Sequence, residues 1–295
     1  MNALSPSPKP SETSGEPTVA ALLSWIVPGA GHLYLGRQTL AVVGFVVVAG
    51  LYLFGLKLSG GMGFEFLHEE LRGPLAPALS PELGFLGGLV YQMKSYGFGP
   101  GYPRAFPDLV FLGTALTAAA GILNLCLTAQ AHHDARRPRG AGYSLQSPGL
   151  VAALAWLVPG LGHLVQGRRL RAVLVFVAIV GLLVLGSQLA DGANLSRERH
   201  FYYWGGQFLA GLPALLLEFA GGHPRITGDI PYAEGGLVIA AIGGLLNILA
   251  MLDVYGVAEV RAGVITPRSK SAEPEVQKKS VESLRLQPGE QEVSA

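Results

Sequence analysis

VPGAGHLYLGR, residues 27–37, interrupts an apolar stretch with a proline, three glycines, a histidine and an arginine. A closely similar stretch, VPGLGHLVQGR, follows at residues 158–168. Proline removes a backbone hydrogen-bond donor and clashes with the preceding helical turn, while glycine permits sharp changes of chain direction. Because the same interruption occurs twice, we expect a broken helical segment in each half of the chain.

The composition indicates a membrane protein. Half of the 295 residues are hydrophobic and 14% are charged, against about 25% charged residues in ordinary soluble domains. A helix needs about 20 apolar residues to cross the hydrocarbon core of a bilayer. Four segments without Asp, Glu, Lys or Arg approach or exceed that length, at residues 38–56, 109–132, 172–190 and 235–252. The net charge of +1 gives no reason to expect nucleic acid as a partner.

The chain consists of two copies of one unit, because constant sequence offsets relate its halves. An offset of 131 pairs Trp25 with Trp156 and His32 with His163, and after the long loops an offset of 123 pairs Asn124 with Asn247. Polar tails without hydrophobic periodicity are typical of disorder. We therefore predict disordered tails at residues 1–17 and 261–295, membrane repeats at 18–132 and 149–260, and a linker at 133–148.

Basic residues predict which side of the membrane each helix end faces, since they gather at cytoplasmic ends. Eight arginines flank the predicted spans at equivalent ends: Arg37, Arg136, Arg137, Arg139, Arg168, Arg169, Arg171 and Arg261. The long loops 57–108 and 191–234 hold seven Lys or Arg against ten Asp or Glu, which suits the exoplasmic side. A segment 151–167 that crossed the membrane would separate the arginines before it from those after it.

We therefore predict an all-α integral membrane protein with four full spans and two re-entrant segments. A helix over residues 19–27 rises only about 14 Å, roughly half of the bilayer core. Both termini then lie in the cytoplasm, and we expect the protein in a bacterial inner membrane. The alternative has six spans and inverted halves, as in many transporters.

Small residues at regular spacing predict close packing of the membrane helices. Gly113 and Gly121 in the first unit, and Gly236 and Gly244 in the second, occur at spacings that let helix backbones approach each other. Asn124 and Asn247 follow and could hydrogen-bond across the interface between the halves.

The repeated motif is the candidate functional site. Its residues are Pro28, Gly29, Gly31, His32, Gly36 and Arg37, with Pro159, Gly160, Gly162, His163, Gly167 and Arg168 in the second copy. A repeated ionisable group in an apolar segment is costly and usually has a partner. The histidines are interpreted either as a paired site for a proton, an anion or a metal, or as structural groups that satisfy freed carbonyls. We favour the structural interpretation. Neither Asp134 nor Asp253 has a carboxylate at the equivalent position of the other half.

Other site classes have little support in the sequence. No two histidines have a metal-ligand spacing, no nucleotide-binding glycine loop is present, and no nucleophile motif occurs, so we predict no metal, no cofactor and no catalytic residue. In the long loops we expect one short helix each, at 81–94 and 205–219, with Tyr202, Tyr203 and Trp204 at the headgroup level.

The sequences PGAGHLYLGR and PGLGHLVQGR resemble the family of two-transmembrane-helix domains that carry a Gly-x-Gly-x-His-Arg-Phe-Tyr-x-Gly signature. They are also similar to bacterial membrane proteins of unknown function with Pro-Gly-x-Gly-His or Pro-Gly-x-Gly-Gln before a Gly-Arg turn. The resemblance covers residues 19–56 and 150–187, and Gly29, Gly31, His32, Tyr34 and Gly36 match in type and order. It implies a membrane hairpin domain and no particular reaction.

The sequence favours a non-enzymatic scaffold or assembly component whose partners are the lipid bilayer and other membrane proteins. A transporter with a site at the repeat interface is the first alternative, and it predicts a hydrated cavity lined by the repeated histidines and asparagines. A lipid-modifying enzyme is the second, and it predicts a polar cluster that faces the lipid headgroups.

Overall fold

Each half of the chain begins with a short helix that ends just before the motif proline. In the computed structural model these helices are α1 (Pro17–Ile26) and α7 (Pro148–Leu157). A single helical turn follows in each half, α2 (Ala30–Tyr34) and α8 (Leu161–Val165). The break predicted from the Pro-Gly pair is therefore present in both halves of the chain, and in each half a short helix, a turn and a second, shorter helix follow one another in the same order.

The structure describes residues 15–67, 72, 75–97, 105–138, 142, 144–222 and 230–264. Residues 1–14 and 265–295, most of the predicted disordered tails, lie outside these ranges. The remaining tail residues belong in part to helices, because α1 begins at Pro17 and the last helix ends at Arg261.

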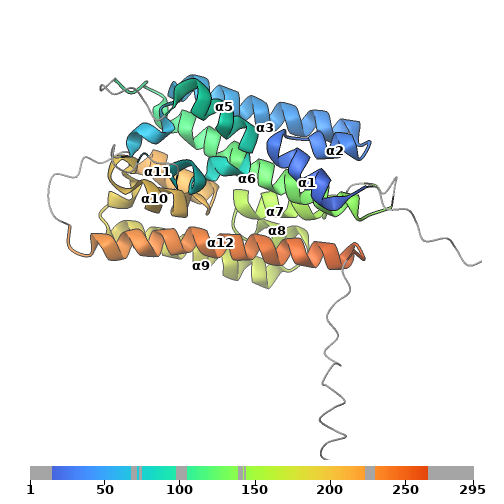
Figure 1. Cartoon of the computed structure of the whole chain (residues 1–295). Coiled ribbons are helices and arrows are strands. Elements are labelled where there is room, and N and C mark those ends of the chain that lie inside the picture. The colour runs from blue at the N-terminus through green and yellow to red at the C-terminus, as the bar shows by residue number, and fades with distance from the viewer. Residues whose placement is uncertain are drawn as a thin grey trace, which may run out of the picture. The chain divides into compact units, whose positions relative to one another are not determined.

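Within the described residues, four helices are long and apolar enough to cross a membrane. They are α3 (Gln38–Ser59), α6 (Val110–Ala135), α9 (Arg169–Leu189) and α12 (Ala233–Arg261), at the four positions predicted. α3 packs along α6 in the first half, and α9 packs along α12 in the second. α6 is the most buried of the four. It packs on α7 of the second half, and its side chains share an apolar cluster with Trp204 and Phe208 of α10 (Arg197–Phe208). In Figure 1 it lies between α3 and the helices of the second half.

The long loops contain more helices than predicted. The first has η1 (Met62–Phe66), α4 (Leu75–Ala78), η3 (Pro81–Gly84) and α5 (Leu86–Tyr96). The second has η4 (Ala193–Leu195), α10 (Arg197–Phe208) and α11 (Leu212–Gly221). The single helix expected over 205–219 is wrong, because the chain turns at Gly211, whose φ is 73°. The helix expected over 81–94 is likewise divided at Phe85.

In both halves the short first helix meets a loop segment that comes from the opposite end of the bundle. The Trp25 indole at the end of α1 donates a 2.7 Å hydrogen bond to the carbonyl of Leu83, just before α5. At the end of α7, the carbonyl of Trp156 lies so close to Gly211 that a Cβ atom there would overlap it. Each half therefore contains two short helices whose ends meet inside the protein, beside two long ones.

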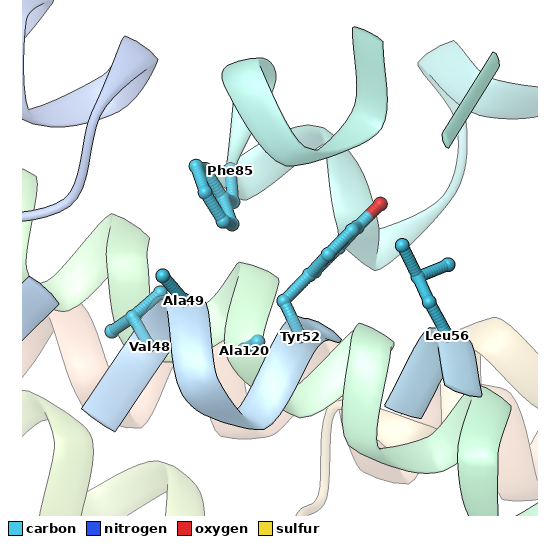
Figure 2. Packing of buried hydrophobic residues seen from close by; sticks show 6 residues of the cluster. All are labelled: Val48, Ala49, Tyr52, Leu56, Phe85 and Ala120. Atoms are coloured by element: carbon cyan, nitrogen blue, oxygen red, sulfur yellow. The ribbon is translucent and has the colours of Figure 1, made fainter. Parts of the chain in front are cut away.

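An apolar cluster holds the first loop segment against the long helices. Phe85 packs on Tyr52 edge to face, with ring centroids 5.1 Å apart. Val48, Leu56 and Ala120 complete the contact, as Figure 2 shows. Burying such side chains contributes roughly 1.5–3 kcal/mol each, which keeps the loop segment inserted between α3 and α6.

Gly113 provides a test of the helix packing. A Cβ atom at this position of α6 would lie 2.6 Å from the carbonyl oxygen of Gly55 on α3. We expect Gly113→Ala to destabilise the protein by about 1–3 kcal/mol, because the backbones must separate. Thermal unfolding in detergent measures the change.

Gly50→Ala is the matched control, since a Cβ atom at Gly50 of α3 meets no atom within 4 Å. It should leave stability unchanged or raise it by up to about 1 kcal/mol through better helix propensity. Equal effects of the two substitutions would contradict the close approach of α3 and α6.

Candidate functional site

The repeated motif folds into the same turn in both halves. Gly29 and Gly160 have φ values of 79° and 84°, in the left-handed region that favours glycine, and each precedes one helical turn. Gly36 and Gly167 end that turn at φ values of 74° and 79°.

The turn fixes the motif histidine and arginine relative to each other. The backbone N–H of Arg37 donates a 2.8 Å hydrogen bond to the carbonyl of His32, and Arg168 bonds to His163 in the same way at 2.9 Å. Both motif prolines are buried. The motif therefore places its histidine and its arginine side by side, twice.

The remaining motif glycine lets the turn pack on the preceding helix. Gly31 donates its N–H to the Ser24 hydroxyl at 3.1 Å, and a Cβ atom at Gly31 would overlap the carbonyl of Ala20. Gly162 approaches the carbonyl of Val151 in the second half. As a result both motif histidines are almost completely buried.

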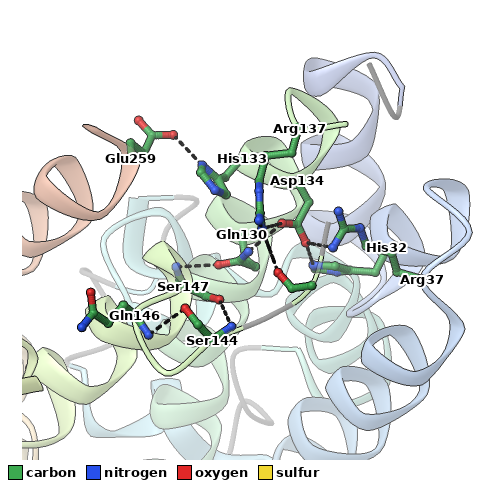
Figure 3. Close-up of polar contacts among 12 residues, drawn as sticks. His32, Arg37, Gln130, His133, Asp134, Arg137, Ser144, Gln146, Ser147 and Glu259 are labelled. Atoms are coloured by element: carbon green, nitrogen blue, oxygen red, sulfur yellow. Dashed lines mark hydrogen bonds and ion pairs between the residues drawn. The ribbon is translucent and has the colours of Figure 1, made fainter. Parts of the chain in front are cut away.

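In the first half, Asp134 near the end of α6 is the carboxylate that faces the motif. Its Oδ2 atom lies 3.8 Å from His32 Nε2 and 3.5 Å from Arg37 Nη1. Its Oδ1 atom lies 3.8 Å from Arg137 Nη1 and accepts a 2.8 Å hydrogen bond from Gln130 Nε2, as Figure 3 shows. The carboxylate is fully buried and has two guanidinium groups beside it.

Gln130 connects this cluster to the second half. Its Oε1 atom accepts a 2.8 Å hydrogen bond from the backbone N–H of Gly149, in the first turn of α7. The amide therefore bridges the Asp134 carboxylate and one of the backbone N–H groups that a helix start leaves without an intrahelical partner.

In the second half, Asp253 on α12 plays the corresponding part. Its Oδ2 atom lies 3.0 Å from His163 Nε2 and 2.6 Å from Arg168 Nη1, and its Oδ1 atom lies 3.3 Å from Arg171 Nη1. This cluster is open, since the Asp253 side chain is 39% exposed whereas Asp134 is not exposed at all.

These two carboxylates were not predicted as site residues from the sequence. At the offset of 123, Asp253 pairs with Gln130, and Asp134 pairs with Val257, so neither aspartate is repeated at the level of alignment. Residues 130 and 134 are one helical turn apart and lie on the same face of α6. In each half a carboxylate therefore faces the motif, but the two carboxylates lie on helical turns that are neighbours in the alignment. A comparison of the halves that allowed for a shift of one helical turn would have revealed the pair.

The arginines, rather than the histidines, balance the two carboxylates. Burial lowers the pKa of His32 to about 4, and the nearby Asp134 carboxylate opposes this shift without overcoming it. Burial also lowers the pKa of His163. Both imidazoles are therefore neutral near pH 7, and the ionic contacts are those of each carboxylate with two guanidinium groups.

The repeated asparagines do not meet across the halves. Asn124 Nδ2 donates to the carbonyl of Ser24 at 3.0 Å and to that of Gly84 at 2.9 Å. Asn247 Nδ2 donates to the carbonyls of Ala155 at 3.2 Å and Leu209 at 3.0 Å. Each amide thus joins the short first helix of its own half to the loop segment that meets it, which corrects the predicted contact across the interface.

The predicted small-residue positions all make close contacts. Gly113 and Gly236 approach α3 and α9, respectively, while Gly121 approaches the carbonyl of Pro81 and Gly244 approaches that of Gly206. The glycines therefore let one long helix and one loop segment approach the backbone of α6 closely, and the same holds for α12.

Two further polar clusters connect the halves. At the motif end, the Glu259 carboxylate of α12 pairs with Arg136 and lies 3.3 Å from His133 Nδ1 of α6. Arg136 and Glu259 are equivalent positions in the repeat, at the offset of 123.

At the other end of the bundle, the buried Arg197 is 2.6 Å from Glu218 and donates to the Thr114 hydroxyl of α6. Trp204 belongs to this cluster. The Arg197 guanidinium lies 3.9 Å from the centre of the Trp204 ring, and the Trp204 indole N–H donates a 3.0 Å hydrogen bond to the Glu218 carboxylate. Trp204 is buried, so its predicted position among the lipid headgroups is wrong.

The described residues fold into helices arranged as two copies of one unit, and four of these helices are long and apolar enough to cross a membrane, which indicates a membrane protein. Both copies match a family of unknown function, DUF6677, over residues 19–139 and 150–264, and the chain belongs to this family. Comparison with curated proteins and with solved structures gave no significant match.

Moving the carboxylate by one turn tests the equivalence of the two clusters. Asp134→Val should destabilise the protein by about 3–5 kcal/mol, because Arg37 loses a buried partner. Combining it with Gln130→Asp reproduces the residues of the second half, and we expect thermal unfolding in detergent to show substantial recovery.

Gln130→Asp alone is the control and should destabilise, because it places two carboxylates one turn apart on a helix. If the double variant unfolds at the same temperature as Asp134→Val, the two carboxylates are not equivalent.

Proposed function

We propose that four helices span the bacterial inner membrane, that the broken segments enter it halfway, and that both termini are cytoplasmic. The equivalent ends of α3, α6, α9 and α12 support this topology, because the described flanking arginines all lie at those ends. Short helices that meet inside the bundle from opposite ends also fit half-insertion from both sides. The six-span alternative would place the arginines before and after α7 on opposite sides.

Cysteine labelling tests this topology. In a Cys126→Ser background, Leu145→Cys and Leu170→Cys introduce thiols at sites that are 73% and 75% exposed. We expect an impermeant maleimide to label both from the cytoplasmic side only, and Leu75→Cys in the first long loop from the opposite side only. Labelling of positions 145 and 170 from different sides would establish the six-span arrangement.

We further propose that the protein is a non-enzymatic membrane scaffold. The observation that carries this proposal is the bonding of its repeated polar side chains. Each asparagine amide donates to backbone carbonyls of both the short first helix and the loop segment of its own half, and each histidine faces a carboxylate that arginines balance. Polar groups used in this way hold the short helices in place, whereas a transport site would direct them towards a solute.

The open second-half cluster favours a lipid-modifying enzyme as the second candidate. Arg171 is 57% exposed beside the partly exposed Asp253, so a lipid phosphate has access to this cluster. Guanidinium groups bind phosphate bidentately, and a histidine next to a carboxylate is a common acid–base arrangement.

Reconstitution separates the scaffold from its alternatives. In vesicles of phosphatidylethanolamine and phosphatidylglycerol, a scaffold leaves lipid composition and imposed ion and proton gradients the same as in empty vesicles. In mild detergent extracts of native membranes it should also elute with a second membrane protein at fixed stoichiometry. Protein-dependent lipid turnover that His163→Ala abolishes would overturn the scaffold in favour of the enzyme, and protein-dependent loss of a gradient would overturn it in favour of a transporter.

A further inference from the structure

An apolar groove lies where the first half meets the second. It has a volume of about 300 Å³ and is lined by three helices: Val43 and Val47 of α3, Leu123 and Cys126 of α6, and Leu150 and Ala153 of α7. Val43 and Val47 are more than half exposed, so the groove opens on the outer, apolar surface of the bundle.

The length of the groove corresponds to one leaflet of a bilayer. Along α3 it runs from Leu40 to Val48, which is about 12 Å at a rise of 1.5 Å per residue. Half of the hydrocarbon core is about 15 Å. The groove begins near the motif end of α3 and stops near the middle of the helix, as a lipid chain of a single leaflet would.

The groove has polar groups at its motif end only. Gln130, Ser144 and Ser147 line that end, and the rest of the lining is apolar apart from the Cys126 thiol and the glycines. The Ser147 hydroxyl accepts the N–H of Ser144 at 3.2 Å, and the Ser144 hydroxyl accepts that of Gln146 at 3.2 Å. Each hydroxyl acts as an acceptor in these contacts, so it retains a proton with which to donate to an anionic oxygen.

Positive charge lies beside this polar end. The Arg137 guanidinium, 20% exposed, donates to the carbonyl of Gly142, two residues before Ser144. Arg261 of α12 donates to the Gln146 side chain at 3.3 Å. Figure 3 shows Arg137 and the segment 144–147 around the same end of α6.

We propose that this groove binds one anionic phospholipid of the leaflet on the motif side, with an acyl chain along α6 and the phosphate at Ser144 and Ser147. The gradient from polar to apolar along the groove matches an amphiphile, and the arginines complement a negative headgroup. A second groove, along α9 and α11, lacks this gradient, because Val158, Phe176, Leu183, Leu212, Leu216 and the rest of its lining are all apolar. That second groove serves as the internal comparison.

Cys126, the single cysteine of the chain, lies in the groove wall and reports its occupancy. In delipidated protein, alkylation of Cys126 by a small apolar maleimide should slow about tenfold when phosphatidylglycerol is added at ten times its Kd. Phosphatidylcholine at the same mole fraction should protect much less. Equal protection by both lipids, or alkylation that depends on protein concentration instead of lipid, would overturn the proposal, the latter because a second copy would then cover the groove.

A count of bound lipid by native mass spectrometry gives an independent measurement. The wild-type protein should retain one phosphatidylglycerol per chain, and Ala153→Trp should retain none because the indole fills the groove. Leu22→Trp is the matched control, since Leu22 is the repeat equivalent of Ala153 and is exposed on α1; it should retain the lipid.

The headgroup contact is tested by the Ser144→Ala, Ser147→Ala double variant. We expect it to weaken phosphatidylglycerol retention several-fold while thermal stability in lipid-free detergent stays unchanged. Full retention by this variant together with retention by Ala153→Trp would place the lipid elsewhere and refute the site.

Discussion

The fold depends on satisfying backbone carbonyls that a broken helix leaves free inside an apolar environment. An unpaired carbonyl there costs several kcal/mol, because no water replaces the lost partner. Asn124 meets this requirement in the first half, with hydrogen bonds to Ser24 and Gly84, and Asn247 meets it in the second. One side chain from a long helix thereby holds together two short helices that arrive from opposite ends.

The carboxylates apply the same principle to charge. A buried carboxylate is tolerated only with close, well-bonded counter-charges, and Asp134 has Arg37 and Arg137 within 4 Å. The Pro-Gly turn supplies Arg37 at a fixed position relative to His32, through one backbone hydrogen bond. The motif that breaks the helix therefore also provides the Arg37 guanidinium, which compensates the negative charge of Asp134 on α6.

Repeats and hydropathy predicted the four long helices, the duplication and the double break at Pro28 and Pro159, because these depend on local residue patterns. The partners of the repeated polar residues were not predictable in this way. Asp134 and Asp253 occupy positions one turn apart in the alignment, so a position-by-position comparison does not pair them, whereas the packing of α2 on α6 and of α8 on α12 shows that they are equivalent. The division of the loop helices at Phe85 and Gly211 was missed for a similar reason, since each break is set by contact with the end of α1 or α7.

The central position of α6 makes the two copies chemically unequal. Where α6 carries Ala119 and Cys126 against the second half, α12 carries Ile242 and Leu249 at the equivalent positions, and these are 41% and 61% exposed. Small side chains let another unit come close, whereas bulky aliphatic ones suit contact with acyl chains. The second copy therefore presents an exposed aliphatic surface at the positions where the first copy packs against its neighbour, so one repeated helix serves as the centre of the bundle and the other as part of its outer face.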